Sequence, residues 1–271
     1  MIVIADSGST KCNWQLVDDS GSVRRVQSRG INAVLQRPDE VEALLRETFA
    51  EPVQADALHF YGAGCGERYP EQSARLREAL AVESDLMGAA RALLGGRAGI
   101  ACILGTGSNS CYYDGVRIVR NTPPLGWVLG DEGSGTYIGR QLVGNLLKGL
   151  CDESLRRLFF EEERLDYDEI IRRVYREGMA NRFLASFTRF VARHIDRPEL
   201  DELVCEAFCA FVRRNLAHYP ADAEVSALGG VACHFERQLR HVLATEGLRA
   251  GRIVETPDEG LLNYHIWNRS E

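Results

Sequence analysis

The feature that most constrains the fold is a strand-turn-strand pattern that occurs twice. Residues 2–5 form a short β-branched run, residues 6–11 are turn-forming, and residues 12–17 alternate again between apolar and polar. Further along the chain, residues 100–104 lead into a second glycine-rich turn at residues 105–109. A match in strand order and turn chemistry is typical of a duplicated α/β unit, although two unrelated hairpins would also give it. We therefore expect two α/β domains.

The helical periodicity indicates where each domain lies. With 271 residues, the chain is long enough for two domains of ordinary size. Apolar residues recur with helical spacing in three segments of the first part, at 38–45, 71–80 and 85–93. We expect an N-terminal domain over residues 1–96 and a larger C-terminal domain, with a helical insertion, over residues 97–271. A terminal helix from about residue 258 can pack back on the first domain.

The amino-acid composition argues against several classes of binding partner for this chain. Lys and Arg number 32 against 39 Asp and Glu, so the net charge of −7 argues against binding to nucleic acid or anionic lipid. No apolar run approaches the roughly 18 residues of a membrane span. The eight cysteines contain no C-x-x-C pair and no signal peptide is recognisable, which argues against a zinc site and favours a reduced, cytoplasmic compartment.

The first turn has the chemistry of an anion site. A turn of Asp, Gly, Ser and Thr after a strand presents backbone N–H groups and hydroxyls to an anion, and its Asp can hold a divalent metal through water. Hairpin turns favour the same residues for conformational reasons, so one such turn is weak evidence. The chain has neither the P-loop nor the dinucleotide-binding glycine pattern. Two phosphate-binding hairpins remain the hypothesis.

The motifs resemble those of the actin, hexokinase and heat-shock-protein ATPase superfamily. Its two ribonuclease-H-like domains clamp ATP in the cleft between them, so the resemblance implies an α/β fold of that kind. Within the superfamily the chain is most similar to the N-acetylglucosamine kinase branch of the BadF/BadG/BcrA/BcrD ATPase family. The matching segments are the first phosphate motif at 6–11, the second at 105–109, the sugar-kinase signature at 126–135 and the adenosine motif at 228–232.

The resemblance also implies cofactors, a substrate and a set of roles. ATP and Mg²⁺ are the expected cofactors, and an amino sugar is the expected substrate. Asp85 matches the catalytic carboxylate, and Asp6 matches the residue that holds magnesium through water. The expected contacts to ATP are Gly8, Ser9, Thr10, Lys11, Thr106, Gly107, Gly229 and Gly230. The expected contacts to the sugar are Asn32, Ser108, Asn109, Gly126 and Asp131.

Simpler interpretations exist for several of these residues. Asp85 follows Ser84 and precedes an apolar helical pattern, so it could be only an N-cap or a first-turn acid. Asn32 could be a turn residue, and Asp131 could simply precede a helix that begins near Ser134. The order of Asp85 between the two phosphate turns favours the catalytic interpretation.

The chain also departs from the family pattern. A second glycine is common at the position of Ser7, and a threonine at the position of Cys12. The stretch between Trp127 and Gly130 is two residues shorter than in the animal enzymes. The walls of the sugar pocket are therefore the least transferable detail.

Three functions compete at this point. The leading hypothesis is an ATP-dependent kinase that phosphorylates the 6-hydroxyl of an amino sugar, most plausibly N-acetylglucosamine, and works as a homodimer. The second is an ATPase of the same family that activates a dehydratase or reductase through an iron–sulfur cluster. The third is a sugar sensor without catalysis.

Overall fold

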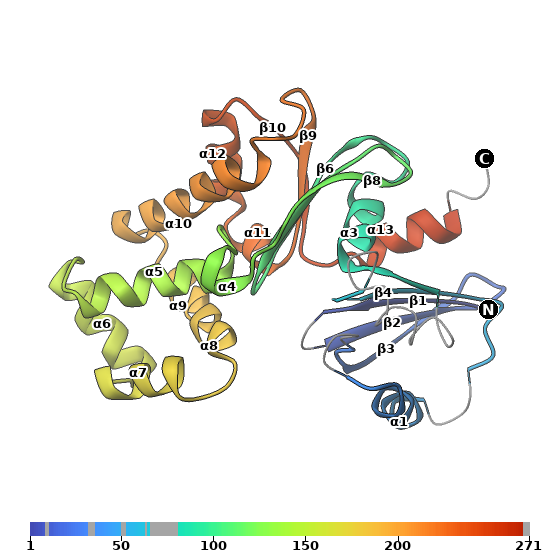
Figure 1. Ribbon diagram of the computed structural model, residues 1–271, viewed down its shortest axis with the longest axis horizontal. Helices are drawn as coiled ribbons and strands as arrows, with labels where there is room; N and C mark the ends of the chain where they lie inside the picture. The colour runs from blue at the N-terminus through green and yellow to red at the C-terminus, as the bar shows by residue number, and fades with distance from the viewer. Residues whose placement is uncertain (9–10, 32–35, 50–52, 63, 66–80, 268–271) are drawn as a thin grey trace. The chain divides into compact units, whose positions relative to one another are not determined.

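The computed structural model describes residues 1–8, 11–31, 36–49, 53–62, 64–65 and 81–267 (Figure 1). The chain divides into two compact units. Unit 1 comprises Met1–Arg97, Gly115–Arg117 and Pro257–Glu271, and unit 2 comprises Ala98–Asp114 and Ile118–Thr256. The chain therefore leaves unit 1, builds unit 2 and returns to unit 1 at its end.

A five-stranded sheet in the order β3-β2-β1-β4-β5 forms the centre of unit 1. The first three strands are antiparallel neighbours, and β4 and β5 are added parallel to β1. The strands are β1 (Ile2–Ser7), β2 (Lys11–Val17), β3 (Val23–Arg29), β4 (Ala57–Gly62) and β5 (Ala81–Ser84). The helices are α1 (Pro38–Thr48), α3 (Asp85–Leu94) and α13 (Asp258–Leu262), with a π-helical turn η2 (Asn263–Trp267) at the end.

The two faces of this sheet pack against different helices, because alternate side chains of a strand point to opposite sides. Trp14 lies on one face with Val41 and Leu44 of α1. Its indole N–H donates to Ser28 Oγ at 2.9 Å, which satisfies the one polar atom of this buried ring. On the opposite face, Ile4 packs against Leu261 of α13. Helix α13, near the end of the chain, is thus part of the core of unit 1.

Unit 2 repeats the same sheet. Its order is β8-β7-β6-β9-β10, again with three antiparallel strands followed by two parallel ones. The strands are β6 (Gly99–Leu104), β7 (Ser108–Tyr113), β8 (Ile118–Thr122), β9 (Glu224–Leu228) and β10 (Arg249–Val254). The prediction of an α/β fold built from a duplicated unit is therefore confirmed.

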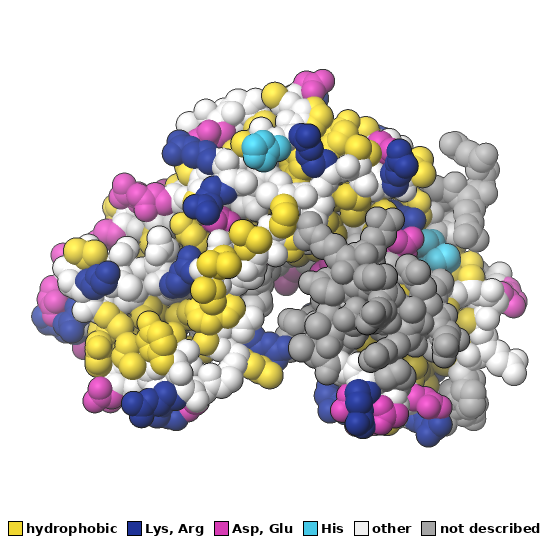
Figure 2. Space-filling view, in the orientation of Figure 1, with side chains coloured by type: hydrophobic (Ala, Val, Ile, Leu, Met, Phe, Trp, Pro, Cys, Tyr) yellow, Lys and Arg dark blue, Asp and Glu magenta, His cyan; other side chains and the backbone are white. Residues whose placement is uncertain are grey.

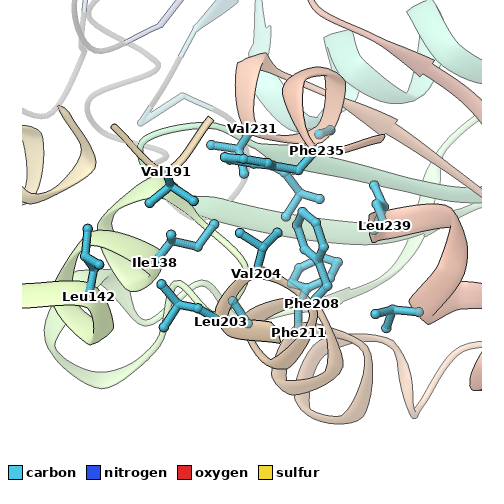
Figure 3. Close-up of a cluster of buried hydrophobic side chains, with 14 of the residues drawn as sticks. Ile138, Leu142, Val191, Leu203, Val204, Phe208, Phe211, Val231, Phe235 and Leu239 are labelled. Carbon is cyan, nitrogen blue, oxygen red and sulfur yellow. The ribbon is translucent and has the colours of Figure 1, made fainter. Parts of the chain in front are cut away.

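Most of the helices belong to unit 2, and they build its large apolar core. They are α4 (Gly126–Leu129), α5 (Gly135–Leu147), α6 (Glu153–Glu163), α7 (Tyr167–Tyr175), α8 (Ala180–Ser186), α9 (Thr188–Arg193), α10 (Pro198–Phe211), the π-helix η1 (Val212–Leu216), α11 (Gly230–His234) and α12 (Glu236–Thr245). Figure 3 shows Phe208 and Phe211 of α10 converging with Phe235 and with Ile138 of α5. These aromatic rings are at most 1% exposed, so they anchor the C-terminal end of α10 in the core.

Two boundaries differ from the sequence predictions. Strand β1 continues through Asp6 and Ser7, and β7 already begins at Ser108, so the turns are shorter than expected. In both cases backbone pairing with the neighbouring strand extends into residues whose side chains favour turns. The predicted helix at residues 71–80 lies outside the described residues.

The surface carries charges of both signs. On the face in Figure 2, Lys and Arg side chains are interspersed with Asp and Glu. Several are paired along one helix, as in Arg172–Glu169 on α7 and Arg240–Glu236 on α12. Exposed pairs of this kind contribute at most about 1 kcal/mol each, so the apolar cores carry most of the stability. No helix among the described residues is long and apolar enough to cross a membrane.

Candidate functional site

The end of β1 places Asp6 beside a tight turn. The Gly8 amide donates to the Lys11 carbonyl at 3.1 Å and closes the connection from β1 to β2. Asp6 pairs in register with Asn13 of β2, and Ile4 pairs with Gln15, so these four side chains share one face of the sheet. Asp6 thus lies on the face of unit 1 that packs against α13.

Two other carboxylates act on Asp6 on this face. Burial, followed by the charges of Asp85 and Asp258, raises the pKa of Asp6 to about 7, although Lys11 acts in the opposite direction. Burial also raises the pKa of Asp85, against a backbone hydrogen bond that lowers it. Like charges held in a poorly solvated place are costly unless a cation or a proton compensates them. Among the described residues no three His, Cys, Asp or Glu side chains are grouped so that they could hold a metal ion, so a cation beside Asp6 would be held largely through water.

Helix α3 begins at Asp85 for a local reason. Ser84 is its N-cap, with Oγ accepting from the Met87 amide at 3.1 Å. Asp85 is in the first turn, and its Oδ1 accepts from the Leu86 amide at 2.8 Å. Ser84 rather than Asp85 therefore caps the helix. The Asp85 carboxylate has a second oxygen, Oδ2, with which it can bind a proton.

Asp258 was not among the predicted site residues. It begins α13, and the buried Gln15 donates from Nε2 to the Asp258 carbonyl at 3.0 Å. Two buried acceptor oxygens here, Asp258 Oδ1 and Gln15 Oε1, receive no hydrogen bond from the residues that the structure describes. Gln15 is only 2% exposed, so this unpaired oxygen is expensive. The sequence signal that marks the segment is an acid directly after Pro257, at the predicted start of the terminal helix.

Ser7 anchors the segment that leads toward Asn32. Its hydroxyl donates to the Ile31 carbonyl at 2.9 Å and accepts from the Ile31 amide at 2.7 Å. Both residues are fully buried. The serine that departs from the family pattern thus satisfies both backbone groups of Ile31. Asn32 itself, like Ser9 and Thr10, lies outside the described residues.

In unit 2, the first turn of α5 supports the turn between β6 and β7. The Gly135 amide donates to the Gly105 carbonyl at 2.8 Å. The Thr136 amide and hydroxyl both donate to the Thr106 carbonyl, at 3.1 and 2.7 Å. Because its carbonyls are already used in this way, the turn is rigid, and the Thr106 side chain remains half-buried at its tip.

Asp131 is brought against the same turn. Its Oδ1 accepts from the Ser108 amide at 3.2 Å, and a Cβ placed on Gly107 would lie 3.1 Å from its Oδ2. Burial raises the pKa of Asp131, the Ser108 amide lowers it, and the charge of Glu132 raises it. The backbone of Asp131 is left-handed, with φ of 56°, which few residues other than glycine adopt. The structure therefore brings Gly107, Ser108 and Asp131 together.

The Gly229–Gly230 pair meets this turn from the other side. Gly229 has φ of 124°, and a Cβ there would collide with the Leu104 carbonyl. Its amide donates to the Val254 carbonyl at 2.9 Å, and Gly230 begins α11. Only glycine fits between β9 and the end of β6. The predicted adenosine motif and second phosphate motif are thus neighbours.

The two other predicted sugar-binding residues of unit 2, Asn109 and Gly126, form no hydrogen bond with Gly107, Ser108 or Asp131 in the part of the chain that the structure describes. Asn109 turns its Oδ1 to the Ser110 amide and to Asn121 Nδ2, each at 2.9 Å. Gly126 begins α4 and is exposed, and no contact joins it to Asp131 in the geometry above. The roles assigned to both residues stay predictions.

A comparison with solved structures places the chain in a family. It is 42% identical to a candidate N-acetylglucosamine kinase from Porphyromonas gingivalis, with 99% of this chain and 100% of that chain covered and a TM-score of 0.93. The chain belongs to the N-acetylglucosamine kinase-like family. This confirms the resemblance inferred from the motifs and the expectation of a phosphotransferase.

Two further solved structures resemble the chain in fold. A candidate N-acetylglucosamine kinase from Chromobacterium violaceum is 19% identical over 97% of this chain and 98% of that one, with a TM-score of 0.77. A glucokinase from Streptomyces griseus, solved with glucose and AMPPNP, is 16% identical over 100% and 99%, with a TM-score of 0.53. At these identities the likeness concerns the fold.

The curated relative is an N-acetylmuramic acid/N-acetylglucosamine kinase from Clostridium acetobutylicum. It is 36% identical over 111 residues, which span 37% of this chain and 35% of that protein. No family model matches the chain.

Proposed function

We propose that this member of the N-acetylglucosamine kinase-like family is an ATP-dependent kinase that phosphorylates the 6-hydroxyl of an amino sugar, with N-acetylglucosamine as the preferred substrate. The observation that carries the proposal is Asp85. Its carboxylate is fixed in the first turn of α3, and burial raises its pKa, which makes it a stronger proton acceptor. The names of the P. gingivalis and C. acetobutylicum proteins support the choice of sugar.

In this proposal Asp85 accepts the proton of the sugar hydroxyl as that oxygen attacks the γ-phosphate of ATP. The oxygen–phosphorus bond forms, the bond to ADP breaks, and the proton stays on Asp85 until solvent removes it. The phosphates are bound by the two glycine-rich turns, through Gly8, Ser9, Thr10 and Lys11 in the first and Thr106 and Gly107 in the second. Gly229 and Gly230 approach the adenosine.

The sugar in this proposal is bound by amides, a hydroxyl and a carboxylate, which are the groups that hold sugar hydroxyls. They are Asn32, Ser108, Asn109, Gly126 and Asp131. Support comes from unit 2, where the Ser108 amide and the Asp131 carboxylate already contact each other.

The residues around Asp6 fit a hydrated magnesium ion. Asp258 Oδ1 and Gln15 Oε1 are buried acceptors that receive no hydrogen bond from the described part of the chain, and water bound to a cation would supply donors to them. Asp6 would hold the ion, assisted by these two oxygens. When bound, the ion would neutralise charge on the phosphates.

The decisive experiment is a coupled ADP-release assay with N-acetylglucosamine, glucosamine, N-acetylmannosamine, N-acetylmuramic acid and glucose. We expect the highest kcat/KM with N-acetylglucosamine, and phosphorus–proton NMR correlation should place the phosphate on carbon 6. ADP release that no sugar stimulates would refute the kinase. Sugar binding without turnover would instead support the sensor hypothesis.

We also propose that the enzyme works in the cytoplasm as a homodimer. None of the eight cysteines forms a disulfide, which agrees with a reducing compartment. Light scattering after size-exclusion chromatography would test the dimer, since a single species of 30.2 kDa would contradict it.

A further inference from the structure

Glu132, next to Asp131, is buried in a way that the proposed reaction does not use. Its side chain is 9% exposed, and Oε1 lies 2.7 Å from Arg214 Nε. Its second oxygen, Oε2, accepts from Asn215 Nδ2 at 3.3 Å. A carboxylate in such a place is stable only because both oxygens are paired.

Both partners come from η1, which is itself held firmly. The Asn215 carbonyl accepts from the Thr122 hydroxyl of β8 at 2.7 Å. Just before η1, Phe211 is 1% exposed in the core, and a Cβ placed on Gly133 would lie 2.8 Å from its Cβ. Short π-helical segments are rare and frequently mark functional sites. Glu132 therefore connects the loop at residues 131–134 to a rigid part of unit 2.

This connection explains how Asp131 keeps a strained backbone. A left-handed conformation at a residue other than glycine costs free energy, and contacts on both sides of Asp131 offset that cost. On one side, the Asp131 carboxylate meets the Ser108 amide at 3.2 Å. On the other, the chain continues into the paired Glu132 and then into Ser134, whose Oγ caps α5 by accepting from the Tyr137 amide at 3.1 Å.

We propose that Glu132 is a positioning residue: held by Arg214 and Asn215, it fixes the left-handed backbone of Asp131 and so determines where the Asp131 carboxylate meets the sugar. The nature of the ligand rests on the proposed function, whereas the positioning of Asp131 does not. Glu132 would act on sugar affinity without touching the sugar or ATP.

The neighbouring residue of η1 provides a matched control. Arg213 forms the same kind of pair one position earlier, with its Nη2 at 2.8 Å from Glu246 Oε1. Both arginines are mostly exposed, at 69% and 65% of the side chain, so replacing either with Met removes one charge and one ion pair. Only Arg214 is paired with the residue next to Asp131.

The experiment compares Arg214→Met with Arg213→Met in the full chain. We expect Arg214→Met to raise the Kd for N-acetylglucosamine, measured by calorimetry, roughly ten- to a hundredfold and to leave the Kd for AMPPNP within about twofold. Arg213→Met should leave both values within about twofold. A general loss of structure would instead weaken both ligands, so the split between sugar and nucleotide separates positioning from stability.

Hydrogen exchange tests the positioning without any ligand. In Arg214→Met, but not in Arg213→Met, the amides of Ser108 and of residues 131–134 should exchange faster. If the wild-type protein binds none of the amino sugars yet this difference appears, the proposed function is wrong and the positioning stands. If the sugar binds, and Arg214→Met alters neither its affinity nor the exchange, the positioning is wrong. Glu132→Gln should give an intermediate result, because the amide keeps one acceptor oxygen.

Discussion

Replacing Asp6 with Asn should make the free protein more stable while it removes the carboxylate proposed to hold magnesium. At pH 8 Asp6 is ionised in both the folded and the unfolded chain, but in the folded chain burial and the charges of Asp85 and Asp258 oppose its ionisation. A pKa of about 7, against the ordinary value of 3.8, corresponds to roughly 4 kcal/mol at most. We expect Asp6→Asn to raise the free energy of unfolding by about 2–4 kcal/mol at pH 8 without magnesium.

The sign of the effect fixes its pH dependence. Because the folded pKa is raised, the penalty is absent below the unfolded value of 3.8 and grows as pH rises to about 7, where it levels off. The stabilisation by Asp6→Asn should therefore shrink by up to about 1.4 kcal/mol for each pH unit below 7. Urea unfolding at pH 5 and pH 8, followed by tryptophan fluorescence, measures it, since Trp14 is buried in unit 1.

Asp39→Asn is the control for the Asp6→Asn experiment. Asp39 is an exposed acid of α1 in the same unit, and Asp39→Asn should change stability by less than about 0.5 kcal/mol at either pH. An Asp6→Asn variant that is less stable than the wild type at pH 8, or equally stabilised at both pH values, would refute the reasoning. Magnesium with AMPPNP should stabilise the wild type and not this variant.

Three further changes have clear expectations. Asp85→Asn should lower kcat by roughly 10²–10⁴ with AMPPNP binding and melting temperature preserved, because Ser84 caps α3; near-normal turnover would exclude a base at this position. Gly229→Val should cost more than about 2 kcal/mol of stability, because its side chain would meet the Leu104 carbonyl; a well-folded variant with only a higher KM for ATP would show that the contact relaxes. Ser7→Ala should cost about 1–3 kcal/mol in urea unfolding, since both Ile31 backbone groups lose their partner, and an equal loss in the exposed Ser20→Ala would contradict this.

The parts that the sequence predicted are those determined by local chemistry. Alternating strands, glycine-rich turns and the Ser84 cap depend on residues close together in the chain, so the duplicated sheets and the start of α3 followed from pattern. Strand ends were less predictable, because pairing with a neighbour draws Asp6 and Ser108 into strands.

The contacts that sequence patterns did not indicate join distant segments. Asp258 reaches the face of Asp6 only because α13 returns to unit 1, and Gln15 contacts it across 243 positions of the chain. Glu132 and Arg214 are likewise paired across unit 2 from elements of different type. Neither pair has a spacing that a single sequence marks, since the packing of whole elements brings its members together.

The return of the chain to unit 1 has a consequence for how the protein is made. While the ribosome synthesises residues 98–256, the sheet of unit 1 has been translated but lacks α13, so Ile4 and Tyr61 have Ala92 of α3 beside them but not Leu261 and Leu262. Unit 2, whose segments are nearly continuous, can fold first, and the core of unit 1 is completed only after α13 has been synthesised. Helix α13 also delivers Asp258, so a chain synthesised only through unit 2 presents the Asp6 carboxylate without this neighbour.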